Sequence, residues 1–362
     1  MKAKKIAFVK FVALLIPIMI FTGCNPAANV PSASSNSVLK SNSEQSGLEF
    51  GNDVVIVGTF NGSPVDRTPA EAIDDPVQIH YNGSTCALQY KFTATGSSKD
   101  TGFLLLIDNT PVPYRAQSED APLEYCHTFH IEEEGETCEF TIYFTPPAGA
   151  SGEEKPVQLA RITNPEYKPD LVETSQYGMF NHQVVASVGS EWYRLVYDAD
   201  CDGFDSSLLL KNVMKAPSFE TELLTDEWTS INWIYGGKID PEELEAYPRQ
   251  LITFDGQENS SGNQQVQEGS VQITLLLCGP TGLSYNTVFY LDDIPLCTES
   301  GQFVFTTTLE RGSISTITFD LPAEAFSEGK TFYALSLAEN SGVFPEANVT
   351  AGLQTPPVYL YQ

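Results

Sequence analysis

The chain has 362 residues, of which 19 are Lys or Arg and 47 are Asp or Glu, and its net charge is −28. A surface this acidic repels phosphate groups, which argues against nucleic acid and anionic lipid head groups as partners. Hydrophobic residues make up 41% of the chain and aromatic residues 11%, so it can form real cores, and its length predicts two or three domains.

The first 23 residues have the pattern of a secretory signal peptide, with early lysines before an apolar run from Phe11 to Phe21. The run is too short to span a membrane, and a longer, uncleaved anchor would bring Lys10 into the lipid. The Ile-Phe-Thr-Gly-Cys stretch ending at Cys24 resembles the lipobox of bacterial lipoproteins, although Phe21 stands where Leu is usual. The resemblance implies cleavage after residue 23, a diacylglycerol on Cys24, and a lipid-anchored protein on the extracytoplasmic face of a bacterial membrane.

A flexible tether is predicted for residues 24–51. Ser, Asn, Ala and Pro dominate this stretch and no apolar periodicity is present, so it cannot bury enough surface to offset the entropy of ordering. Loss of the signal peptide would remove four lysines and leave 15 basic against 47 acidic residues, a net charge of −32. This composition suits an acidic body held away from the membrane by a spacer.

The rest of the chain contains two similar units, residues 52–197 and 228–362, joined by a connector at residues 198–227. The segments that match between the units are 54–58 with 231–236, 77–83 with 250–256, 104–112 with 288–296, 157–160 with 333–336, and 194–197 with 358–361. Each unit also has a helix start with a capping box, Thr68 to Glu71 in the first and Asp240 to Glu243 in the second.

Most of the matching segments are short β-rich runs that end in turns. Alternating apolar residues predict one hairpin over residues 125–144 and another over residues 303–319. Many short strands separated by turns are typical of all-β, antiparallel sandwiches. Each unit resembles a bacterial immunoglobulin-like domain, which implies two tandem β-sandwiches.

The acidic stretch at the start of the connector resembles the first half of an EF-hand calcium loop. Asp198, Asp200 and Asp202 occupy alternate positions and Gly203 follows, as in the sixth position of such a loop. Asp205 or Ser206 would supply a further ligand, but Leu209 stands where the family has a bidentate Glu, and no helix pair flanks the loop. A structural calcium ion and a plain acidic turn both fit this pattern.

Aromatic residues gather near the predicted junction of the units. Trp192, Trp228, Trp233 and Tyr235 would stack on sugar rings if they were exposed, as in carbohydrate-binding modules. The alternative is that these side chains fill the sandwich interiors, as large aromatic residues commonly do.

Six cysteines remain once Cys24 carries the lipid, and an exported chain can oxidise them. Cys126, His127, His130 and Cys138 lie close in sequence, but the predicted hairpin separates them, which argues against both a zinc site and a Cys126–Cys138 disulfide. Cys278 with Cys297 is the better candidate pair. Buried thiols are the alternative for most of the six.

No phosphate-binding loop, nucleophile elbow or metal-binding histidine pair is present in the sequence. The leading hypothesis is therefore a non-catalytic, lipid-anchored surface protein that binds a surface protein or glycan, as an adhesin or an accessory subunit. The alternatives are a carbohydrate-binding module and a hydrolase that uses paired carboxylates. A cleft with two close carboxylates of raised pKa would favour the hydrolase.

Overall fold

A computed structural model describes residues 59–169, 171, 183–205, 209–210, 213–224, 247–258, 262–266, 269–340, 343 and 352–362. Contacts between Cα atoms group residues 49–362 into one compact unit. The predicted signal peptide and tether, with Cys24, lie outside the described residues. Within the described ranges, no helix is long and apolar enough to cross a membrane.

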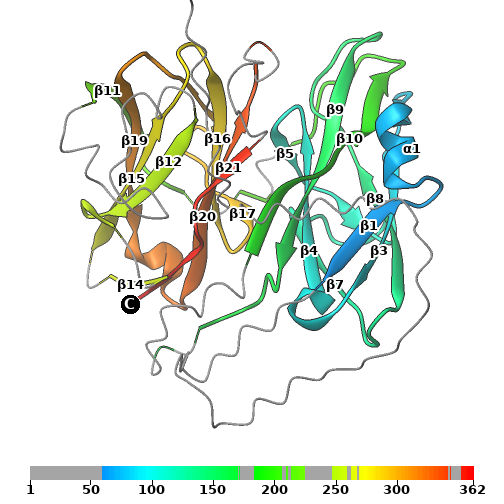
Figure 1. Cartoon of the computed structure of the whole chain (residues 1–362), viewed down its shortest axis with the longest axis horizontal. Helices are drawn as coiled ribbons and strands as arrows, with labels where there is room; N and C mark the ends of the chain where they lie inside the picture. The colour runs from blue at the N-terminus through cyan, green and yellow to red at the C-terminus, as the bar shows by residue number, and fades with distance from the viewer. Residues whose placement is uncertain are drawn as a thin grey trace, which may run out of the picture. The chain divides into compact units, whose positions relative to one another are not determined.

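The first β-sandwich consists of two sheets, drawn from blue to green in Figure 1. One sheet has the order β1-β3-β8-β6, and the other has the order β2-β10-β9-β4-β5 with β7 also paired to β4. Strand β10 runs parallel to β2, and the other pairs are antiparallel. The elements are β1 (Phe60–Pro64), α1 (Pro69–Asp74), β2 (Val77–Tyr81), β3 (Cys86–Ala94), η1 (Gly96–Lys99), β4 (Asp100–Ile107), β5 (Thr110–Val112), β6 (Arg115–Ala116), β7 (Cys126–His130), β8 (Thr137–Phe144), β9 (Glu154–Thr163) and β10 (Gln183–Tyr197).

The second sandwich has the same plan. Its sheets have the orders β11-β19-β15-β12-β13 and β14-β22-β20-β16-β17, with β18 paired to β16 and β21 to β20. The elements are β11 (Ser218–Leu223), β12 (Arg249–Phe254), β13 (Gln257–Glu258), β14 (Asn263–Gln265), β15 (Ser270–Cys278), β16 (Ser284–Leu291), β17 (Ile294–Pro295), β18 (Phe305–Thr308), β19 (Ser313–Pro322), η4 (Ala323–Phe326), β20 (Lys330–Ala338), β21 (Gly352–Gln354) and β22 (Val358–Tyr361).

Each sandwich has its own core between its two sheets. In the first, alternate residues of β3 are buried, and Tyr90 and Phe92 pack against Phe103 from the facing sheet. In the second, Phe289 packs against Phe319 in the same way. Period-two burial of this kind is what a sheet with one face on a core requires. The predicted all-β, two-sandwich fold is therefore confirmed.

The capping box predicted for the first unit is present at α1. The Thr68 side chain accepts from the Glu71 N–H at 3.4 Å, and the Glu71 carboxylate accepts from the Thr68 N–H at 2.8 Å. The hydrogen bonds that the Glu71 carboxylate accepts from the Thr68 N–H and from the Thr68 hydroxyl lower the pKa of Glu71. The corresponding helix start at Asp240 lies outside the described residues.

The order of strand pairing corrects one match between the units. The sequence matches residues 250–256, which lie mainly in β12, to residues 77–83, which lie mainly in β2. In the structure, β12 pairs with β15 in the way that β1 pairs with β3. The strand that pairs as β2 does with β10 is β14, whose partner is β22. The counterpart of β12 is therefore β1. Short β-rich runs resemble one another in composition, so their similarity does not identify the neighbour to which each run bonds.

Both predicted hairpins, at residues 125–144 and 303–319, are wrong. Strand β7 pairs with β4 whereas β8 pairs with β3, and likewise β18 pairs with β16 whereas β19 pairs with β15. In each unit the chain crosses from one sheet to the other at the predicted bend. A hairpin and a crossing both turn their apolar faces toward one core, so alternation alone cannot distinguish them.

The predicted connector contributes to both sandwiches. The Cys201 backbone forms an isolated β-bridge with Gly149, and the Cys201 side chain is buried in the first core. Met214 is buried in the second core, and β11 pairs along its whole length with β19. Residues 218–223, predicted as connector, are thus a strand of the second sandwich, at the end of its sheet order among the described residues.

Candidate binding surfaces

The predicted calcium loop directs its acidic side chains to separate partners. Asp198 pairs with His80 at 2.9 Å, and the Asp200 carboxylate accepts from the Ser151 N–H at 2.9 Å. Across the part of the chain that is described, no group of three or more His, Cys, Asp or Glu side chains is arranged to hold a metal. Asp202 and Asp205 lie in the irregular segment that follows, and Ser206 lies outside the described residues. Calcium binding here stays a prediction.

Of the predicted sugar-stacking residues, the structure describes Trp192. Its half-buried ring is stacked on Tyr90, with 6.4 Å between the ring centroids, and packs against the first core. Trp192 therefore fills the sandwich margin and does not form an open platform. Trp228, Trp233 and Tyr235 lie outside the described residues.

All six cysteines from Cys86 to Cys297 are thiols in the structure. Cys126 lies in β7 and Cys138 in β8, which belong to different sheets. His127 pairs with Glu124 at 2.6 Å, and His130 pairs with Asp100 at 2.5 Å. Cys126, His127, His130 and Cys138 therefore do not converge on one point.

A third apolar cluster joins the two sandwiches. It combines Leu104 and Leu106 of β4 and two residues of β9 with residues from β16 and β20. The complete cluster, which we call the seam, is Leu104, Leu106, Ala160, Ile162, Val288, Tyr290, Tyr333, Leu335 and Leu337. These strands are counterparts in the two repeats, so equivalent sheet faces pack on each other.

The strands of the seam are buried on both faces. Seven of the eight residues of β4 are buried, and β16 has the same pattern. Phe103 and Leu105 face the first core, whereas Leu104 and Leu106 face the seam. Continuous apolar strands are typical of sheets that are covered on both sides. The unbroken Phe103–Ile107 run is therefore a sequence signal for the seam, which the alternation of apolar residues does not reveal.

A cavity of about 430 Å³ lies beside the seam and is lined by both repeats. Asp292 and Asp293, from the turn between β16 and β17, line it with Cys126, Lys168 and other residues. Both aspartates have positive φ values of 49° and 61°, matching Asp108 and Asn109 at 50° and 61° in the first repeat. Such angles are those of a two-residue hairpin turn, in which Asp and Asn are favoured.

Asp293 is a buried carboxyl in this turn. Tyr333 donates to its Oδ1 at 3.0 Å, and the Tyr333 ring stacks on Tyr290 at 4.9 Å. The pKa of Asp293 is raised to about 7, mainly by burial and with a smaller contribution from the neighbouring Asp292, while the Tyr333 hydrogen bond opposes the shift. Burial also raises the pKa of Asp292, which accepts from the Thr331 N–H and lies 3.8 Å from the Lys330 ammonium. The sequence motifs did not identify this pair.

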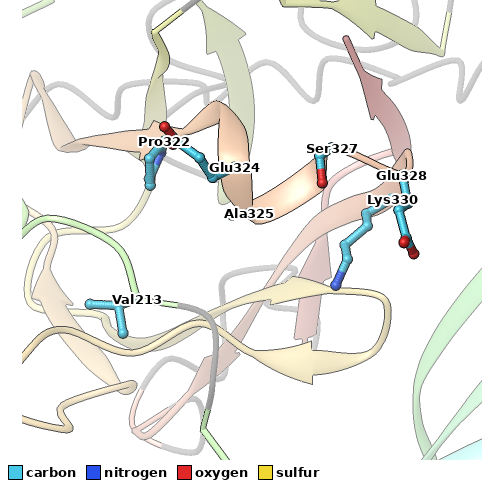
Figure 2. A pocket seen from close by; sticks show the side chains of 7 residues that line it. All are labelled: Val213, Pro322, Glu324, Ala325, Ser327, Glu328 and Lys330. Atoms are coloured by element: carbon cyan, nitrogen blue, oxygen red, sulfur yellow. The ribbon is translucent and has the colours of Figure 1, made fainter.

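A second cavity, of about 440 Å³, lies on the second sandwich. Figure 2 shows Pro322 and Glu324 where β19 runs into η4, Lys330 at the start of β20, and Val213 on a separate segment. Its charged residues are of both signs, and Lys330 is already paired with Asp292. The lining predicts no particular ligand.

The remaining surface feature is β11, at the end of its sheet order in the described structure. All six of its residues are exposed. Phe219 and Leu223 are 52% and 75% exposed. Edge strands present unpaired backbone groups and are natural sites for pairing with another chain.

Neither a protein-family model nor a curated protein matches this sequence. A chain from the complex of Dpr2 Ig1-Ig2 with DIP-Theta Ig1-Ig3 is similar at 9% identity and a TM-score of 0.18, over 84% of this chain and 65% of that chain. The C-terminal domain of the AgI/II polypeptide BspA of Streptococcus agalactiae is similar at 10% identity and a TM-score of 0.18, over 79% and 95%. Similarities at this level neither identify a family nor bear on function.

Proposed function

We propose that this chain is a lipid-anchored protein of the bacterial cell surface that binds a macromolecular partner without catalysis. The observation that carries the proposal is the joining of two sandwiches through an apolar seam, in a chain whose first residues resemble a lipobox followed by a predicted tether. The sheet faces that pack on each other in the seam are buried and cannot contact a partner. Edges, loops and other exposed surfaces are then available for recognition.

A packed seam favours a presenting role because it fixes the two repeats as one body. Leu106, Tyr290 and Tyr333 are fully buried there. Separating the sandwiches would expose these side chains at a cost of about 2 kcal/mol for each one. The net charge of −32 expected for the mature chain would also keep the body away from anionic lipid head groups. The tether then serves as a spacer.

The anchor is tested by feeding producing cells an alkyne fatty acid and detecting the label on this chain. We expect labelling of the wild type and none of Cys24→Ser, with external protease removing the body from intact cells only in the wild type. Cells bearing the wild-type chain should also acquire a binding activity, toward host or neighbour-cell surfaces, that Cys24→Ser cells lack. An unlabelled chain, or one protected from external protease, would contradict the proposed location.

The acidic cavity favours one second candidate, a hydrolase that uses carboxylate chemistry. Asp292 and Asp293 are adjacent, both have a raised pKa, and both line a cavity, which is the pattern of a general acid beside a second carboxylate. Their hydrogen bonds to Thr331 and Tyr333 of β20 favour a structural role instead. A panel of chromogenic glycosides and esters distinguishes the two. Turnover that is lost in Asp293→Asn would establish the hydrolase.

A further inference from the structure

Strand β11 has one bonded side and one outward side. The Leu224 N–H donates to the Gly312 carbonyl at 2.8 Å, at the end of the β11–β19 ladder. Hydrogen bonding alternates along an antiparallel strand, so the even-numbered residues of β11 bond to β19. The N–H and C=O groups of Phe219, Thr221 and Leu223 therefore point away from β19, toward the edge of the described sheet.

The side chains of the same three residues lie at the border of the second core and are only partly covered by it. The Phe219 ring lies 6.3 Å from the ring of Phe305, which is 1% exposed and belongs to the facing sheet. The face of β11 that carries Phe219, Thr221 and Leu223 is thus the core-facing side, yet Phe219 and Leu223 remain largely exposed. An apolar side chain placed beside them would extend the core.

The opposite face of β11 is acidic. Glu220 and Glu222 are exposed there, and their cross-strand neighbours on β19 are Thr316 and Ile314, so β19 places no basic side chain opposite them. Directly opposed side chains on neighbouring strands interact, and opposite charges are favourable in such pairs. A strand added at this edge gains most when it places Lys or Arg beside the two glutamates.

We propose that β11 binds an extended segment of a partner protein by strand addition, and that apolar residues alternate with Lys or Arg in this segment. Backbone hydrogen bonds to Phe219, Thr221 and Leu223 would supply affinity, and the alternating side chains would supply specificity. A second copy of β11 fits this edge poorly because its glutamates would meet Glu220 and Glu222. The inference rests on the proposed binding function and specifies its surface.

The probe is a fluorescent, end-capped peptide of seven residues, Thr-Lys-Val-Lys-Val-Lys-Thr, titrated into the purified chain at low salt. The matched peptide carries Glu in place of each Lys. We expect the Lys peptide to bind and the Glu peptide to bind about tenfold more weakly. The variant Glu220→Lys with Glu222→Lys should reverse this preference. Its matched control, Glu133→Lys with Glu134→Lys on an exposed loop of the other sandwich, carries the same charge change and should leave the preference unchanged.

The backbone is tested separately. Thr221→Pro removes an outward N–H, which an edge strand tolerates, and should abolish peptide binding, whereas Thr221→Val should retain it. Hydrogen exchange gives a readout without any variant. The amides of Phe219, Thr221 and Leu223 should exchange rapidly in the unliganded chain and slowly with the Lys peptide.

Slow exchange of these three amides without peptide would overturn the proposal, because the edge would already be covered by this chain or by a second copy. Equal binding of both peptides would also overturn it, because Glu220 and Glu222 would then not select the charge of the added strand. An equal effect of the loop control would overturn it as well, since attraction to net charge would then suffice. Such failures would leave fatty-acid labelling and surface exposure unaffected, so they can be separated from a failure of the proposed location.

Discussion

Asp293→Asn is expected to remove a pH-dependent destabilisation of the folded protein. The folded state raises the pKa of this carboxyl from 3.8 to about 7, mainly by burial. Between these two values the folded chain binds more protons at this group than the unfolded chain does. Stability therefore falls as pH rises through this window, and the loss is complete above the folded pKa.

The size of the effect follows from the shift. Linkage gives a cost of about 2 kcal/mol at pH 5 and about 4 kcal/mol at pH 8, a difference of roughly 2 to 3 kcal/mol from one carboxyl. Asn has nearly the same shape, retains an oxygen that accepts from Tyr333, and carries no charge at either pH. The first repeat already has Asn109 at the corresponding turn position, with the same φ of 61°.

The assay is urea unfolding of the wild type and of Asp293→Asn at pH 5 and pH 8. We expect the variant to gain about 2 kcal/mol more, relative to the wild type, at pH 8 than at pH 5. Asp108→Asn, which removes an exposed carboxyl from the corresponding turn of the first repeat, is the control and should show little change with pH. An Asp293→Asn effect that is the same at both pH values would refute the burial argument.

Three further predictions concern stability and thiol chemistry. Leu106→Ala should lower the free energy of unfolding by about 2 to 5 kcal/mol, because Leu106 is fully buried in the seam. Ile73→Ala, at an exposed site, is the control and should change the free energy of unfolding little. Equal effects of the two substitutions would mean that the sandwiches do not pack on each other. Thr68→Ala should cost about 1 kcal/mol by removing the cap of α1, and thermal unfolding that does not shift would argue against the capping box. Burial raises the pKa of Cys86 and of Cys278 to about 12, so iodoacetamide at pH 8 should label both thiols only after unfolding, and a thiol that stays unlabelled in denaturant would reveal a disulfide.

Local chemistry was readable in the sequence because it depends on neighbouring residues. The Thr68 cap depends on side chains a few positions apart, and so do the strands in the second half of each repeat, so both could be predicted from local sequence. The turn after β4 and the turn after β16 were also predictable, since Asp and Asn tolerate positive φ. These features account for the correct fold class and for most of the repeat.

The tertiary structure alone decided which strand joins which sheet. Alternation tells which face of a strand is apolar, but backbone hydrogen bonds are the same for any neighbour, so β7 with β8 and β18 with β19 were wrongly paired. The seam depends on two sheets of different repeats covering each other, and the burial of Asp293 follows from that packing. The tertiary structure likewise determines which side of β11 faces outward, because a strand becomes an edge only when the order of strands in its sheet is set.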